Sequence, residues 1–168
     1  TLTGGAGSDT YLFNLGDGQD TINDSPDSAG NAIRFGAGIA AANVRFYRQD
    51  ADLLVTYGTQ GDSILIKDFA SDGLAGEQAI NRIEFADGSS GAYTFDDWGN
   101  VSMNTYDANG QLVGNFWQNS YGDFGNYTYD ANGNLLNESS QYSDGYSRSY
   151  SYTYDANGNM LSETWQFS

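Results

Sequence analysis

The sequence predicts an all-β protein. Its 168 residues include 22 glycines and a single proline. Short apolar runs alternate along the chain with clusters of Gly, Asp, Asn and Ser, a pattern that is typical of strands joined by turns. No long stretch keeps a helical period, and 37–42 could form at most one turn of helix.

The charge of the chain indicates which partners to expect. Six Lys and Arg stand against 22 Asp and Glu, which gives a formal net charge of -16. This balance argues against nucleic acid and anionic membranes as partners, and favours cations. The sequence contains no Cys and no His, so disulfides, histidine-ligated zinc and a Ser-His-Asp triad are excluded. No apolar run is long enough for a membrane span.

The stretch GGAGSDTYLF at 4–13 places glycines and an aspartate directly before a short strand. The glycines allow positive φ angles and let the turn carbonyls approach one another. The same order of glycine, aspartate and strand returns at 16–22. Calcium takes about six to eight oxygen ligands, which carboxylates and carbonyls supply. One turn cannot supply that many, so such turns would have to stack. The alternative is that these are ordinary hairpin turns.

This stretch resembles the G-G-x-G-x-D-x-U-x nonapeptide of haemolysin-type, or RTX, calcium-binding repeats. The resemblance implies a parallel β-roll with Ca²⁺ held between stacked turns. Carried over, the motif aspartates are Asp9 and Asp20, the motif glycines are Gly5, Gly7 and Gly18, and Asn31 takes the aspartate position of a third turn. A site between the first and third turns would use Asp9 with Asp24 or Asp27. The expected core of the roll is Tyr11, Phe13, Ile22, Ile33 and Phe35.

Residues 36–97 have a different character. Four runs read as strands of an antiparallel sheet: Val44–Tyr47, Asp52–Tyr57, Ser63–Lys67 and Ile80–Phe85. Gly91 is expected in a loop. The segment is similar to the haemolysin-type calcium-binding related domain that follows RTX repeats. The resemblance implies a cap over the open end of the roll, which would otherwise expose apolar core and unpaired strand edges.

Residues 98–168 repeat the hexapeptide TYDANG at 105–110, 128–133 and 153–158. This resembles the YD repeats of Rhs-like bacterial surface and toxin proteins. Asp-Ala-Asn-Gly fits a tight hairpin turn with glycine in the left-handed region, so a meander of β-hairpins is expected. Alternation places Tyr150, Tyr152 and Tyr154 on one face. Such a face could bind a ligand, but cross-strand packing is the interpretation we prefer.

The resulting fold class is all-β, with a short parallel β-roll at 1–35, an antiparallel cap at 36–97 and a YD-repeat meander at 98–168. Catalysis is not expected, because every conspicuous aspartate has a turn or calcium explanation. The predicted function is a structural, calcium-binding module from the C-terminal region of a larger secreted bacterial protein. The resemblance implies type I secretion and folding on calcium outside the cell. The expected partners are calcium ions and upstream domains of the same chain. The alternative is an adhesive or self-assembling unit, in which the aromatic YD face contacts a glycan or a second copy.

Overall fold

The computed structural model describes residues 1–24, 30–69, 80–96 and 98–168. Strands dominate, and the only helical element in this part of the chain is the short 3-10 turn η1 (Ala41–Asn43). The all-β prediction is therefore confirmed. The strands are β1 (Thr10–Phe13), β2 (Gln19–Ile22), β3 (Ala32–Phe35), β4 (Arg45–Gln49), β5 (Asp52–Tyr57), β6 (Asp62–Ile66), β7 (Arg82–Glu84), β8 (Ser90–Phe95), β9 (Val101–Tyr106), β10 (Leu112–Gln118), β11 (Phe124–Tyr129), β12 (Leu135–Gln141), β13 (Ser147–Tyr154) and β14 (Met160–Phe167).

The strands form two sheets. A 4-stranded sheet has the order β2-β6-β5-β4, and a 10-stranded sheet has the order β1-β3-β7-β8-β9-β10-β11-β12-β13-β14. Strands β1 and β3 pair in parallel, with Tyr11 opposite Ile33, while β2 lies between them in sequence but belongs to the other sheet. The chain therefore winds from one sheet to the other and back. This is the path of a β-roll, and β1 and β3 begin on the same side of it.

The antiparallel arrangement expected for 36–97 is wrong for two of its strands. β6 pairs in parallel with β2, and β7 pairs in parallel with β3, so both extend the roll. The rest is antiparallel, in the ladders β4–β5, β5–β6 and β7–β8. The parallel pairing covers the strand edges that β2 and β3 would otherwise expose. The sequence pattern could not reveal this, because apolar runs look alike in parallel and antiparallel strands.

Strand β8 contains Gly91, which was expected in a loop. Small residues at 90–92 give this strand a weak sequence signal. Gly91 is buried, and a Cβ there would lie 2.9 Å from the Met103 sulfur on β9. A larger residue here would have to displace the Met103 side chain, a constraint that sequence alone does not show.

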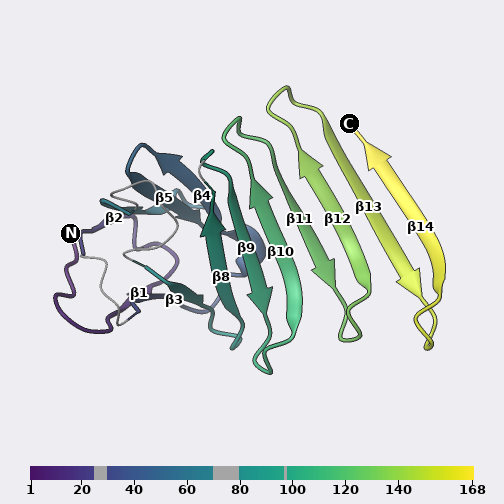
Figure 1. The fold of residues 1–168 in the computed structure, drawn as a ribbon, viewed down its shortest axis with the longest axis horizontal. Coiled ribbons are helices and arrows are strands. Elements are labelled where there is room, and N and C mark those ends of the chain that lie inside the picture. The colour runs from purple at the N-terminus through teal and green to yellow at the C-terminus, as the bar shows by residue number, and fades with distance from the viewer. Residues whose placement is uncertain (25–29, 70–79, 97) are drawn as a thin grey trace.

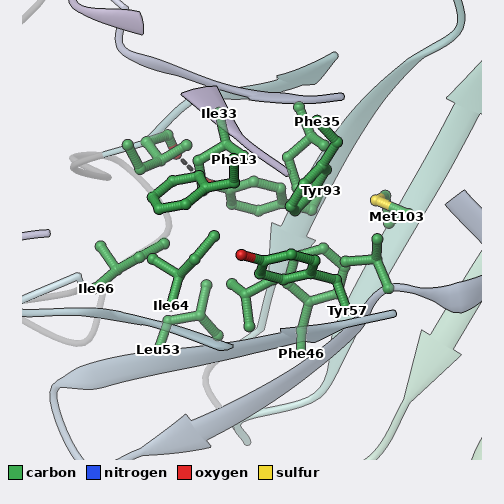
Figure 2. Close-up of a cluster of buried hydrophobic side chains, with 14 of the residues drawn as sticks. Phe13, Ile33, Phe35, Phe46, Leu53, Tyr57, Ile64, Ile66, Tyr93 and Met103 are labelled. Atoms are coloured by element: carbon green, nitrogen blue, oxygen red, sulfur yellow. Dashed lines mark hydrogen bonds between the residues drawn. The ribbon is translucent and has the colours of Figure 1, made fainter. Parts of the chain in front are cut away.

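The core lies between the two sheets, where aromatic and branched aliphatic side chains gather (Figure 2). All five residues expected in the roll core are buried. Tyr57 packs against Phe35, with ring centroids 4.9 Å apart, and Phe46 packs against Tyr93 at 5.8 Å. Val101, Met103 and Phe116 belong to the same cluster, so β9 and β10 are anchored on the roll.

From β8 onwards the large sheet is an antiparallel meander, with β14 in yellow at its far edge (Figure 1). The connections between successive strands from β7 to β14 share the same pair of backbone hydrogen bonds. In the turn of 130–134, Asp130 N–H donates to the Asn134 carbonyl, and Gly133 N–H donates to the Asp130 carbonyl. Gly133 has φ 83°. The hairpin prediction for the YD repeats is confirmed, including a left-handed glycine as the fourth residue of each five-residue turn.

The meander has one aromatic face, as predicted. The register aligns Tyr127, Glu138, Tyr150 and Trp165 across β11 to β14. Paired residues point to the same side of a sheet, so these side chains form one row. The opposite face of the same strands carries polar residues, because Asn126, Ser139, Ser149 and Gln166 are paired in the same way.

Candidate functional site

The first glycine turn, residues 4–9, is held by a buried carboxylate from further along the chain. Gly5 and Gly7 have φ angles of 95° and 110°, which L side chains rarely adopt. The Gly5 N–H donates to Asp24 Oδ1 at 3.3 Å. Asp24 is only 6% exposed, so the turn is fastened to the interior of the roll.

Two side chains also donate to Asp24. The Tyr11 hydroxyl donates to Asp24 Oδ2 at 2.5 Å, and Asn31 Nδ2 donates to the same oxygen at 3.1 Å. Burial raises the pKa of Tyr11 above its ordinary value, and the hydrogen bond to Asp24 raises it further. Asp24 is therefore an acceptor that links β1, the first turn and the third turn in this structure.

Asp9 lies in the same group of residues through Asn31. The Asp9 N–H donates to Asn31 Oδ1 at 2.9 Å. The Asp9 carboxylate lies against Gly4, where no Cβ could be accommodated. Asp9 Oδ2 is buried and has no hydrogen-bond partner in the described part of the chain. A buried carboxylate oxygen without a donor is costly unless a cation or water satisfies it.

The second glycine turn, residues 14–20, repeats this arrangement with an aspartate from β6. Gly16 N–H and Gly18 N–H donate to the two carboxylate oxygens of Asp62 at 2.9 and 3.0 Å. Asp62 is buried. The nearby Tyr57 hydroxyl is buried without a hydrogen-bond partner among the described residues. Burial, followed by the charges of Asp62, Asp17 and Asp20, raises the pKa of Tyr57 to about 12.

Asp62 was missed by the sequence reasoning. A signal for it exists, because Gly61-Asp62 stands directly before the apolar residues Ile64 and Ile66, as in the recognised turns. The expected strand begins only at Ser63, and Asp62 lies in the polar cluster that precedes it. Asp62 reaches the second glycine turn because the parallel pairing places β6 beside β2.

The predicted ligands thus divide between two turns. The first turn brings Asp9, Asp24 and Asn31 together with Gly5, and Gly7 lies in the same turn. Asp20 and Gly18 belong to the second turn, in the other sheet. Asp27 lies outside the described residues. The assignment of these residues as metal ligands stays a prediction.

The chemistry of both turns is that of oxygen donors, which suits a hard cation such as Ca²⁺. Within residues 1–24, 30–69, 80–96 and 98–168, no group of three or more acidic side chains is positioned to hold a metal ion. The carboxylates of Asp24 and Asp62 accept hydrogen bonds from N–H and O–H donors. Asp9 Oδ2 and the Tyr57 hydroxyl are buried and have no hydrogen-bond partner among the described residues. Each oxygen therefore fits a cation or a water molecule bound to a cation.

The YD aspartates are turn residues. Asp130 Oδ1 accepts from the backbone N–H groups of Asn132 and Asn134 at 2.8 Å, and Oδ2 accepts from the Asn134 side chain at 2.9 Å. These bonds, led by that of the Asn134 side chain, hold the pKa of Asp130 below its ordinary value. Both oxygens are occupied within the turn, which leaves a metal little access.

Comparison with known proteins identifies two segments. Residues 52–90 match the family model of the haemolysin-type calcium binding protein related domain. Residues 129–164 match the model of the RHS repeat. The resemblances inferred for the cap and for the YD repeats are thereby confirmed. The resemblance of 4–13 to RTX repeats stays a prediction. No curated protein matches the chain. The two matches indicate a structural repeat module with a connection to calcium. Among the described residues, no helix has the length and apolarity that a membrane span requires.

Proposed function

We propose that the chain is a non-catalytic module of a larger secreted bacterial protein, and that calcium stabilises its roll. The observation that carries this proposal is the buried, unpartnered Oδ2 of Asp9 in a turn built from left-handed glycines. The net charge of -16 supports it, because calcium outside the cell would relieve repulsion that keeps the chain unfolded before export. The match of 52–90 to a calcium-binding related domain agrees with this.

The proposed ligands are Asp9 and turn carbonyls of 4–9, with Asp24 and Asn31 beside them, and Asp20 in the second turn. An extracellular site of this kind has a dissociation constant of about 10⁻⁴–10⁻³ M. At about 10 mM calcium, mass action then stabilises the folded state by roughly 1.4–2.7 kcal/mol. For a chain of this size the melting temperature rises by roughly 3–10 °C.

The test uses a matched pair of substitutions. Asp9→Asn and Asp144→Asn each remove one negative charge, but Asp144 lies in the exposed turn of 142–146, where its Oδ1 accepts from Tyr146 N–H. Calorimetry and thermal melting with calcium, magnesium and a chelator should show stabilisation by calcium in the wild type and in Asp144→Asn. Asp9→Asn should bind calcium more weakly. An unchanged titration for Asp9→Asn would remove Asp9 as a ligand.

A second function is favoured by one feature of the meander. Trp165, Phe167 and Leu161 on β14 are exposed, and aromatic side chains in such a position suit contacts with another surface. The adhesive or self-assembling alternative uses this face. Sedimentation of the wild type and of Trp165→Ser, with and without calcium, distinguishes the two functions. Association that depends on Trp165 and not on calcium would favour the adhesive unit.

A further inference from the structure

A pocket between β4 of the small sheet and the ends of β8 to β10 in the large sheet has the construction of a ligand site. Its volume is about 520 Å³. Three segments line it: β4 with the turn that follows, the β8–β9 turn and the β10–β11 turn. Aromatic residues from all three reach it, namely Phe46, Tyr47, Phe95, Trp98 and Tyr121.

The floor of the pocket contains an unsatisfied polar group. Gln118 at the end of β10 lines the pocket and is only 7% exposed. Its Oε1 is buried and has no hydrogen-bond partner in the described part of the chain. The register places Gln118 opposite Val101 and Phe124, on the face that bears the apolar core. An apolar residue would be the stable choice here, because an unpaired buried amide destabilises the folded state. A polar ligand in the pocket would complete the hydrogen bonds of this amide.

The mouth of the pocket carries two aromatic rings that have no structural role in the core. Trp98 is 78% exposed and Tyr121 is 82% exposed. Both belong to tight turns, and these turns are joined, because Ser120 N–H donates to Asn100 Oδ1 at 3.1 Å. The backbone N–H groups of Trp98 and Tyr121 are also hydrogen-bonded, to Asp96 Oδ1 and Asn119 Oδ1 at 3.0 Å, which limits the freedom that is lost on binding.

The third wall is also shaped in an unusual way. Asp50, in the β4–β5 turn, has φ 56°, a left-handed conformation that is uncommon for residues other than glycine. Its carbonyl accepts from Arg48 Nε at 3.0 Å. The Arg48 side chain also lies near Gly99, with Cδ 3.7 Å from the position of a Cβ there. Arg48 therefore spans from β4 to the β8–β9 turn and closes one side of the pocket.

We propose that this pocket binds a neutral pyranose sugar. A pyranose has an apolar C–H face that suits exposed Trp and Tyr rings, and hydroxyl groups that can pair with the Gln118 amide. The lining of the pocket combines aromatic rings with polar side chains, which suits a ligand that has one apolar face and several hydroxyl groups. Phosphorylated and other anionic ligands are disfavoured by the net charge of -16. The site is distinct from the aromatic face of β11 to β14.

The test is an NMR titration of the full chain with glucose, galactose, mannose and N-acetylglucosamine, with glucuronate as an anionic comparison. At least one neutral sugar should shift the Trp98 indole and Gln118 side-chain amide signals, with a dissociation constant on the order of 1 mM. The absence of shifts at about 0.1 M of every sugar would overturn the proposal. Stronger binding of glucuronate than of any neutral sugar would overturn the assignment of the ligand class.

Three variants locate the site. Trp98→Ala removes an exposed ring and should weaken binding at least about tenfold, a loss of roughly 1.4 kcal/mol. Trp165→Ala, the matched control with a ring that is 65% exposed on β14, should bind as the wild type does. Gln118→Leu should lose binding while melting at or above the wild-type temperature, because it removes an unpaired buried amide. Wild-type affinity in Trp98→Ala, or loss of affinity in Trp165→Ala, would contradict the proposal.

Discussion

Gly125 on β11 offers a sharp test of how the YD meander packs. A Cβ at this position would lie 2.5 Å from the Ser139 carbonyl oxygen and 2.6 Å from Trp117 Nε1. The carbonyl belongs to β12, next to Ser140, which is the direct partner of Gly125 in the ladder. Neither atom can move away without disturbing the sheet or the indole. Gly125→Ala should therefore cost about 1–3 kcal/mol, as overpacking of a core does.

The control is Gly114→Ala on the neighbouring strand β10. A Cβ there would meet the Tyr127 carbonyl oxygen at 3.4 Å and Thr105 Cβ at 3.8 Å, which are ordinary contacts. Gly114→Ala should be neutral or stabilise by about 0.4–1 kcal/mol, because alanine restricts the unfolded chain. Gly125→Ala should lower the melting temperature by roughly 2–12 °C.

A double-mutant cycle separates the two contacts of Gly125. Trp117→Ala removes the indole but leaves the Ser139 carbonyl in place. Gly125→Ala should therefore cost less in the Trp117→Ala background, with a coupling of about 0.5 kcal/mol or more. Thermal melting followed by circular dichroism measures all four proteins. A melting temperature of Gly125→Ala equal to or above that of Gly114→Ala would contradict the packing of Trp117 over Gly125.

Three further predictions follow from the turns and the buried hydroxyls. The pKa of Asp130 is lowered in the folded state, so its contribution to stability is present above about pH 4 and is lost as pH falls through the folded value. Asp130→Asn should retain most of the stability at pH 7, because Asn119 accepts the same backbone hydrogen bonds in the equivalent turn. The melting temperature of this variant should fall less than that of the wild type as the pH is lowered. The pKa of Tyr57 is raised to about 12, so its contribution is lost as pH rises above about 10, and Tyr57→Phe should reduce the alkaline loss without destabilising the protein at pH 7. Chelation of calcium should deprotect 1–24 and 30–35 in hydrogen exchange more than β12 to β14, and equal deprotection would show one cooperative unit instead.

The local structure of this chain was largely predictable, because the residue types in the turns determine where most strands begin and end. The left-handed glycines of the YD turns and the strand Thr10–Phe13 follow from residue types alone. The pairing of strands could not be predicted in the same way. β6 and β7 have apolar runs that suit either direction of pairing, and only their neighbours β2 and β3 decide that the pairing is parallel.

The residues that the sequence assigns to a metal site in the first turn lie together in the structure, but their connections could not be predicted, and their role as ligands stays a prediction. The motif led to Asp9 and Asn31, and the longer third turn offered Asp24 or Asp27. The structure places Asp9, Asn31 and Asp24 in one hydrogen-bonded group. It did not show that Tyr11 and backbone amides would already donate to Asp24. Asp62 was missed because its partners, Gly16 and Gly18, are far away in sequence. Long-range contacts of this kind depend on how the strands are ordered, which local patterns do not encode.

The extent of the core indicates where the rigid part of the molecule ends. Buried residues of the roll, of β4 to β9 and of Phe116 on β10 form one cluster, and Phe124 on β11 packs against its edge. Within the described residues, β12, β13 and β14 contribute no side chain to it. These strands are stabilised by cross-strand pairs and by turns whose carboxylates are bonded locally, and neither depends on the roll. We therefore expect the part of the chain that unfolds together with the roll to extend to about β11, beyond residue 97, where the character of the sequence changes. It follows that β9 and β10 should respond to calcium together with the roll, while the last hairpins extend the sheet as a separately stabilised surface.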